Sequence, residues 1–327
     1  MRYISELIDK EREFCMKENS VMLKYGTEGI PAPGKEISVN LLALGDVGGS
    51  VLTGLRLLGG NVIKQIGIYD LNEKMMRRYE REINQICFPD GRKLPEVVIK
   101  DMNGLFDCDM FVFCASVGVP PVGSSGDVRM AQLEANRKLI DIYAQKAVSD
   151  SFRGIFAVVS DPVDPLCRTV LSAGLAPHQV QGYGLGVMHG RACYYAEKDE
   201  RFAAYRKNGR AFGPHGADLV IANSISDYDD VLSAELTKLA VNSNTETRND
   251  GFKPYIAPAM SSGAISIIET LRGGWNYSSH FLGNSSRGAF LGCRNRRTTE
   301  GIEIENLPLD EALFKRIESA YSNLEKI

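Results

Sequence analysis

Short apolar runs alternate with amphipathic segments through the first half of the chain. The runs are rich in β-branched and aromatic residues and are bounded by turn-forming residues, which is typical of buried strands. Strands that alternate with helices form a parallel sheet, because each crossover helix packs back on the sheet with a right-handed connection. The pattern predicts strands at residues 37–44, 62–69, 96–99, 110–114 and 154–159. We therefore expect a doubly wound α/β sheet of the Rossmann type, with its ligand beyond the carboxyl ends of the strands.

The pattern is different on either side of this region. Residues 1–37 carry apolar positions at helical spacing and end in the breaker sequence Gly-Ile-Pro-Ala-Pro-Gly, which predicts a helical N-terminal arm. Beyond residue 182, a hairpin-like segment at 201–222 is mixed with helical patterns at 187–198, 259–272 and 309–327. We therefore expect three parts: an arm (1–37), a Rossmann domain (38–182) and an α+β domain (183–327).

The composition is that of a folded protein with more than one core. Its 327 residues exceed the length of about 250 at which single cores stop growing. The net charge of −3 gives no electrostatic reason to expect nucleic acid or an anionic membrane, so a small-molecule partner is favoured. Charges interrupt every apolar run near the N-terminus, so we expect neither a signal peptide nor a membrane span, and a cytoplasmic location. Seven cysteines without a C-x-x-C pair predict buried thiols and no metal site.

A glycine-rich turn follows the first predicted strand. Its sequence, Ala43-Leu44-Gly45-Asp46-Val47-Gly48, is a G-x-G-x-x-G turn in which alanine replaces the first glycine. Gly45 would let the backbone approach a pyrophosphate, Gly48 would allow close packing of the following helix, and the amides at the helix N-terminus would bind the anion. The turn predicts a dinucleotide site.

Asp70 lies at the end of the second predicted strand, 22 residues beyond Gly48. A carboxylate at this place accepts hydrogen bonds from the ribose hydroxyls and repels the additional phosphate of NADP, so NAD is the expected cofactor. The alternative is an ordinary strand-turn-helix in which Asp70 caps the next helix.

Six motifs occur in one order along residues 38–327. They are the turn at Gly45, Asp70, the stretch 115–136, Ser160-Asp161-Pro162-Val163-Asp164, the segment 182–191 and Gly213-Pro214-His215-Gly216. Together they resemble the lactate/malate dehydrogenase family. Phe290-Leu291-Gly292 and Gly301-Ile302 also look like the C-terminal strands of that family. The resemblance implies hydride transfer between NAD and a 2-hydroxy acid. It also implies a homodimer or homotetramer, to which residues 1–37 could contribute.

The resemblance assigns roles residue by residue. His215 matches the histidine that exchanges a proton with the substrate oxygen, a task for which the pKa of imidazole is suited. Arg129, seven residues before Asn136, matches the loop arginine that polarises the carbonyl, and Arg191 matches the arginine that grips the substrate carboxylate as a bidentate donor. The resemblance further places Val47, Asn136 and Ser160 along the cofactor and Ser261 beside the substrate. The alternative for each is a structural hydrogen bond or a packing contact.

Two positions depart from the family. Met188 replaces the aspartate that pairs with the family's histidine, and Asp161 replaces the asparagine of the Ser-Asn-Pro motif. A carboxylate beside an imidazole fixes its tautomer and raises its pKa, and methionine does neither. One hypothesis is that the charge has moved to Asp161, which then supports His215. The alternatives are that Asp161 only keeps an isosteric hydrogen bond, or that the site has decayed; Asp218 and His189 are weaker candidates.

The loop 115–129 is longer than that of the family and is rich in small residues, as a lid would be. No cation stands at 122–124, where malate enzymes carry a second arginine, so a monocarboxylate is expected. The sequence therefore predicts an NAD-dependent 2-hydroxy acid dehydrogenase that uses His215, Arg129, Arg191 and Asp161. The competing hypothesis is an impaired relative that binds NAD as a sensor or serves as an assembly partner, with Met188 as its main support.

Overall fold

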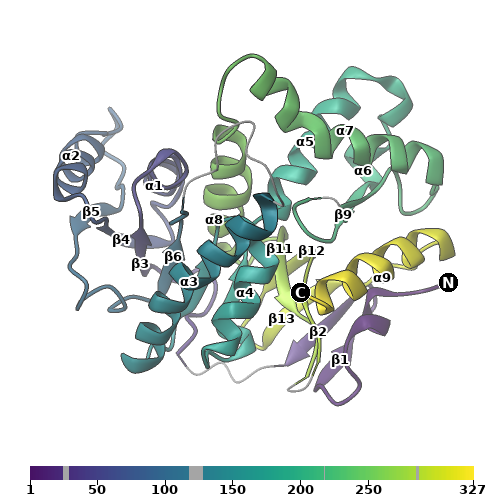
Figure 1. Cartoon of the computed structure of the whole chain (residues 1–327), viewed down its shortest axis with the longest axis horizontal. Helices are drawn as coiled ribbons and strands as arrows, with labels where there is room; N and C mark the ends of the chain where they lie inside the picture. Colours follow the sequence, from purple (N-terminus) through teal and green to yellow (C-terminus); the bar gives the residue numbers. More distant parts are fainter. Residues whose placement is uncertain (25–28, 118–127, 217, 285–286) are drawn as a thin grey trace.

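The computed structural model describes residues 1–24, 29–117, 128–216, 218–284 and 287–327, with the backbone alone for residues 128–132. Within these ranges, eleven strands form one mixed sheet that runs through the molecule in the order β1-β2-β13-β12-β11-β8-β7-β6-β3-β4-β5 (Figure 1). A two-stranded hairpin of β9 and β10 stands apart from it. None of the described helices is both long enough and apolar enough to cross a lipid bilayer.

The parallel half of the sheet confirms the predicted Rossmann architecture. Its strands are β3 (Ile37–Leu42), β4 (Ile63–Tyr69), β5 (Glu96–Ile99), β6 (Met110–Phe113), β7 (Ile155–Val158) and β8 (Val180–Gly182). All neighbours pair in parallel, in the order β5-β4-β3-β6-β7-β8. This order reverses beside β3, so the carboxyl ends of β3 and β6 flank the crevice where such sheets bind their ligands.

Helices cover both faces of this parallel half (Figure 1). One face packs against α1 (Asp46–Leu58), α2 (Glu73–Asn84) and α8 (Ser266–Arg272), and the other against α3 (Val128–Ser149) and α4 (Val163–Ser172). The central strands β6 and β7 are therefore buried along their whole length, which explains why they are continuous apolar runs in the sequence instead of alternating ones.

The other half of the sheet is antiparallel and includes the N-terminal segment. Its strands are β11 (Asn276–Phe281), β12 (Phe290–Arg297), β13 (Gly301–Glu305), β2 (Ser20–Lys24) and β1 (Phe14–Met16). The prediction of a helical arm was wrong, because residues 1–24 form one short 3-10 turn, η1 (Ile4–Leu7), and then the β1–β2 hairpin. Val21 and Leu23 are fully buried against the C-terminal core and Met22 between them is fully buried as well, so burial of β2 outweighs the helical spacing that precedes it.

The remaining elements are mainly helical and are distributed over residues 177–325. They are η2 (Pro177–Gln179), α5 (Leu185–Lys198), η3 (Glu200–Phe202), α6 (Tyr205–Asn208), β9 (Arg210–Phe212), β10 (Val220–Ala222), α7 (Asp230–Asn249), η4 (Pro258–Ile265) and α9 (Glu311–Glu325). The predicted hairpin and the C-terminal helix are present. The helix predicted at 259–272 is divided into a π-helical part, η4, and the α-helix α8. Helix α7 was not predicted.

Candidate active site

The glycine turn joins β3 to α1 with little free space. Ala43 has a φ of 74°, a left-handed conformation that glycine adopts more readily than alanine. A Cβ atom at Gly48 would come within 1.9 Å of the carbonyl oxygen of Ala43, so only glycine fits there. A Cβ atom at Gly45, in contrast, would meet nothing within 4 Å. The turn is therefore closed on its inner side and open beside Gly45, where the backbone can approach a phosphate group. Val47 lies in the first turn of α1, and its partly buried side chain packs against the core.

Asp70 connects the end of β4 to this turn. Its Oδ2 accepts a hydrogen bond from the backbone N–H of Leu44 at 2.7 Å, and its Oδ1 accepts one from the backbone N–H of Asn72 at 2.8 Å. The N-cap of α2 is Asn72, so capping this helix is not the role of Asp70. A carboxylate has about four acceptor positions, and two remain for other donors.

Ser160 and Asn136 fix the segments that leave β6 and β7. The hydroxyl of Ser160 donates to the carbonyl of Ala115 at 2.7 Å. Asn136, which is fully buried, donates to the carbonyl of Asp161 at 2.8 Å and accepts from the backbone N–H of Val117 at 2.9 Å. These bonds hold Asp161 at the carboxyl end of the sheet.

His215 and Asp161 lie in direct contact although they are far apart in the sequence. The imidazole Nδ1 is 2.9 Å from the Asp161 Oδ1. The His215 side chain is 13% exposed and that of Asp161 is 54% exposed, so the pair stands at the inner edge of an opening. Burial of the imidazole disfavours its charged form, but the negative charge of Asp161 and the hydrogen bond to it prevail and raise the pKa of His215.

Arg191 projects from α5 and is 7% exposed. Its guanidinium donates to the carbonyl of Ala240 at 3.3 Å and to the Oδ1 of Asn244, both on α7, and contacts the Sδ of Met188 at 3.4 Å. Burial lowers the pKa of Arg191, and the charge of Asp161 opposes this effect. Arg191 is therefore a buried cation held by α7, and Asp161 is close enough to act on it electrostatically.

Asp164 is a second buried carboxyl group in this region, on the first turn of α4. Its Oδ1 has no hydrogen-bond partner among the described residues. Burial raises the pKa of Asp164 to about 7, an effect that a hydrogen bond from Ser279 and the charge of His215 reduce and the charge of Asp161 reinforces. Sequence reasoning gave this residue no role, although it belongs to the motif that includes Asp161.

A cavity of about 360 Å³ brings these groups together. Its polar side is formed by Asp161, Asp164, Arg191, His215, Asp218 and Asn244, and apolar residues including Met188 complete it. Asn244 was missed because α7 was not predicted and the residue stands in no motif. No group of three or more His, Cys, Asp or Glu side chains in the described ranges is placed to hold a metal ion.

The structure does not bring every predicted residue to this cavity. The side chain of Arg129 lies outside the described residues, as does the lid segment 118–127. Ser261 lines a different cavity of about 420 Å³ together with His189 and is not among the residues that line the candidate site, so its place beside the substrate stays a prediction. It belongs to η4, the π-helical part of the segment for which the sequence predicted a helix. The ring of His189 bonds Tyr205 at 2.9 Å and faces away from this site.

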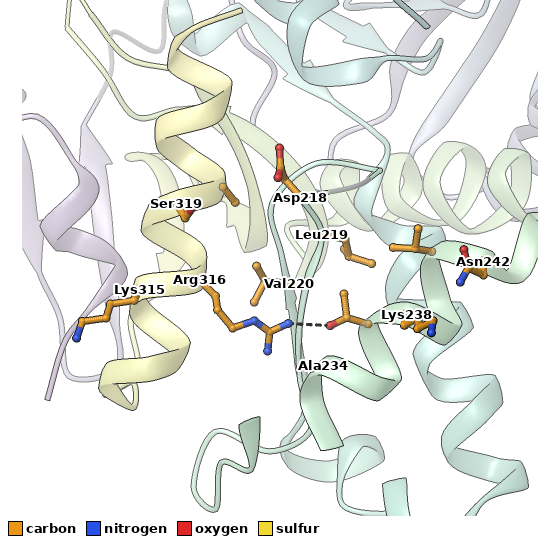
Figure 2. Close-up of a pocket in the computed structure, with 12 residues that line it drawn as sticks. Asp218, Leu219, Val220, Ala234, Lys238, Asn242, Lys315, Arg316 and Ser319 are labelled. Carbon is orange, nitrogen blue, oxygen red and sulfur yellow. Dashed lines mark hydrogen bonds between the residues drawn. The ribbon is translucent and has the colours of Figure 1, made fainter. Parts of the chain in front are cut away.

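A larger cavity of about 590 Å³ lies elsewhere, in a groove between α7 and α9 over β10 (Figure 2). Arg316 spans it and donates to Thr237 at 3.1 Å. It includes Asp218 but neither His215 nor Arg191. The cavity of about 360 Å³ that contains His215 and Arg191 is therefore the candidate site, because these groups can move a proton and bind an anion.

Comparisons with known proteins give relatives of one kind. No protein-family model matches the chain. The L-lactate dehydrogenase of Oceanobacillus iheyensis is 29% identical over 182 residues, 54% of either chain, and that of Borrelia turicatae is 26% identical over 224 residues, 66% of this chain and 64% of the other. The chain thus spans about half to two thirds of the length of these curated relatives.

Solved structures resemble the fold over most of its length. A lactate dehydrogenase from a Medee basin deep-sea metagenome library has a TM-score of 0.71 at 18% identity, covering 89% of this chain and 98% of its own. The malate dehydrogenase of Picrophilus torridus has a TM-score of 0.72 at 16% identity and 88% and 95% coverage. The malate dehydrogenase of Archaeoglobus fulgidus, solved in complex with NADH, has a TM-score of 0.70 at 17% identity and 88% and 97% coverage. These likenesses establish the fold.

Proposed function

We propose that the chain is a divergent member of the lactate/malate dehydrogenase family and an NAD-dependent 2-hydroxy acid dehydrogenase that acts on a monocarboxylate. The observation that carries this proposal is the meeting of Arg191, His215 and Asp161 in one cavity beyond the carboxyl end of β7. An anion clamp and a proton carrier at this place are what the oxidation of a hydroxy acid, or the reduction of an oxo acid, requires of the protein.

The open space at Gly45, the adjacent helix N-terminus and the two remaining acceptor positions of Asp70 fit the pyrophosphate and ribose of NAD. When bound there, NAD would supply or accept the hydride. The carboxylate of Asp70 would oppose the additional phosphate of NADP, which is why NAD is the proposed cofactor.

The protein's own groups would act on the substrate as follows. Arg191 binds the substrate carboxylate, with its guanidinium already oriented by Ala240 and Asn244. His215 donates a proton to the keto oxygen during reduction and removes it from the hydroxyl during oxidation. Asp161 accepts from Nδ1 and so leaves Nε2 for the substrate oxygen. Asp161 also stabilises the imidazolium. In the family, this negative charge comes from an aspartate at the helix position that Met188 occupies here, whereas in this protein it would come from the turn after β7.

The second candidate function is an impaired relative that binds NAD or a 2-oxo acid without turnover. It is favoured by Met188, which is 1% exposed and places an uncharged thioether against Arg191. The contact between His215 and Asp161 argues against it, because this pair provides the charge that methionine cannot.

The test is oxidation of NADH by the pure protein against a panel of 2-oxo acids, with NADH binding measured in parallel by fluorescence. We expect turnover of at least one monocarboxylate, its loss in His215→Gln, and its retention in the matched control His178→Gln, whose ring lies outside the cavity. NADH binding without turnover of any 2-oxo acid would favour the second candidate function. A protein that binds no NADH would contradict the proposed dehydrogenase, and one that binds neither NADH nor any 2-oxo acid would contradict both.

A further inference from the structure

We propose that the substrate carries a branched or aromatic apolar side chain in place of the single methyl group of pyruvate. This inference rests on the proposed function, because it takes Arg191 and His215 as the groups that fix the carboxylate and the reacting carbon. Once these two ends are fixed, the third substituent of the reacting carbon has to occupy the part of the cavity that neither group reaches.

Beyond these two groups, much of the lining is apolar. Its apolar side chains include Val241 of α7, Leu324 of α9 and the half-exposed Ile327, with Val163 and Pro165 of α4 close in sequence to Asp161. None of these side chains offers a hydrogen bond, so a substrate group placed against them gains free energy only if it is apolar. They belong to α4, α7 and the C-terminal segment, whereas Arg191 lies on α5 and Asp161 in the turn after β7.

The cavity is also large for a three-carbon acid. Its volume is about 360 Å³, whereas a water molecule takes up about 30 Å³ of the liquid. A methyl group is close to a water molecule in size, so pyruvate would leave most of the apolar wall in contact with solvent. A side chain of four or more carbons would displace that solvent.

The charges of the cavity disfavour other side chains. Arg191 is the one arginine or lysine among the described residues that line it, so these residues offer a second carboxylate no further cation. Two of the acidic groups are already bonded, because Asp161 contacts His215 and Asp218 accepts from Asn323 at 3.3 Å, so a basic side chain would have to compete with these contacts. Asp164 is buried with a pKa raised to about 7, so it carries at most part of a charge near neutral pH.

The experiment compares kcat/KM for NADH-dependent reduction of four acids: pyruvate, 4-methyl-2-oxopentanoate, phenylpyruvate and oxaloacetate. A buried methylene contributes about 0.8 kcal/mol, roughly fourfold, and 4-methyl-2-oxopentanoate has three more carbons than pyruvate, so it should be preferred by about fiftyfold. Oxaloacetate should be the poorest of the four.

Two variants test whether Val241 and Leu324 provide this preference. Val241→Phe and, separately, Leu324→Phe should each reduce the ratio for 4-methyl-2-oxopentanoate over pyruvate by about tenfold, because the added ring occupies the space of the side chain. Both kcat/KM values of a ratio come from the same variant, so a loss of folded protein lowers them equally and leaves the ratio unchanged. The matched control is Val231→Phe, also on α7 but 77% exposed, which should leave the ratio unchanged.

The two proposals fail in different ways. A preference for pyruvate, for oxaloacetate or for a 2-oxo acid with a basic side chain would overturn the inference while the proposed function stands. If no acid is reduced, calorimetric binding of the same acids to the NADH-loaded protein decides: tighter binding of 4-methyl-2-oxopentanoate than of pyruvate supports the inference although the proposed function has failed. Equal or weaker binding would overturn the inference as well.

Discussion

The Nδ1 of His215 lies 2.9 Å from the Oδ1 of Asp161, a residue that precedes it by 54 positions and belongs to the turn after β7. Helix α5, which carries Arg191, presents the buried thioether of Met188 to the same cavity and no carboxylate. The imidazole therefore receives its negative neighbour from the sheet side of the cavity, and the charge and hydrogen bond of that neighbour raise the pKa of His215 against the effect of burial. The same carboxylate acts on the Arg191 guanidinium.

The backbone at Ala43 predicts a stabilising substitution. A left-handed conformation costs an L-residue roughly 1–2 kcal/mol, of which part is offset in glycine by the greater entropy of its unfolded chain. Ala43→Gly should therefore raise the free energy of unfolding by about 1 kcal/mol in urea denaturation. Ala203→Gly, at an exposed position with a φ of −55°, is the control and should lower it by roughly 0.5–1 kcal/mol. A loss of stability in Ala43→Gly would show that the turn does not strain Ala43.

Asp70 predicts the choice of cofactor. The protein should bind NADH far more tightly than NADPH, and Asp70→Ser should narrow the difference because it removes the charge that opposes the 2′-phosphate. The control is Asn72→Ala, which removes the cap of α2 and should leave the preference unchanged. Fluorescence titration with both cofactors measures the two affinities. Equal affinities in the parent protein would mean that Asp70 serves only to hold Leu44 and Asn72.

The sequence predicts most of the parallel half of the sheet because β3, β6 and β7 are short, largely apolar runs that helices cover on both faces. β5 begins and ends where the pattern predicted, the other four predicted strands differ by one or two residues at one or both ends, and the short strand β8 was not predicted. The N-terminal segment could not be predicted in the same way. Its β1–β2 hairpin is stabilised by pairing with β13, almost 300 residues later, and no local pattern contains that contact.

The site was partly accessible to sequence reasoning. Asp161 and His215 stand in motifs and could be suggested as neighbours, whereas Asn244 stands in none and reaches Arg191 only because α7 packs on α5. Ser261 lies in η4, and no sequence pattern reveals that the predicted helix 259–272 begins with π-helical turns. The burial of Asp164 depends on tertiary packing, so no local pattern indicates that its pKa is raised.

The proposed role of Arg191 predicts that its substitution weakens substrate binding and leaves NADH binding unaffected. Arg191→Lys should raise the Michaelis constant of every active 2-oxo acid by roughly ten- to a hundredfold, because one ammonium replaces a planar donor and charge-assisted hydrogen bonds contribute roughly 1.5–3 kcal/mol each. NADH affinity should stay near its parent value. Steady-state kinetics and fluorescence titration separate the two. Arg92→Lys, whose side chain is 62% exposed and lies outside the cavity, serves as the control. Unchanged Michaelis constants in Arg191→Lys would remove Arg191 from the site.

The burial of Asp164 predicts that its replacement by the uncharged asparagine stabilises the protein in a pH-dependent way. Its pKa is raised by burial from 3.8 to about 7, so in the parent protein the stability associated with the protonated carboxyl is complete below about pH 4 and is lost as the pH rises to about 7. The melting temperature of Asp164→Asn relative to that of the parent should therefore increase between pH 4 and pH 7 and stay constant above. Contributions from groups that do not interact with Asp164 cancel in this difference. A difference that falls with pH over the same range would indicate that Asp164 is stabilised in its ionised form.

The most direct measurement of the central claim, that Asp161 supports His215 in place of a carboxylate on α5, is a double-mutant cycle on kcat/KM with Met188→Asp and Asp161→Asn. Asp161→Asn alone should lower the rate sharply. Met188→Asp alone should lower it or leave it unchanged, since a carboxylate at position 188 would lie beside Arg191 and repel an anionic substrate while Asp161 is still charged. The double variant should recover the parent rate or exceed it, so that the two changes are strongly non-additive. A harmless Asp161→Asn together with a sharp increase in Met188→Asp alone would contradict the account and identify the natural protein as an impaired relative.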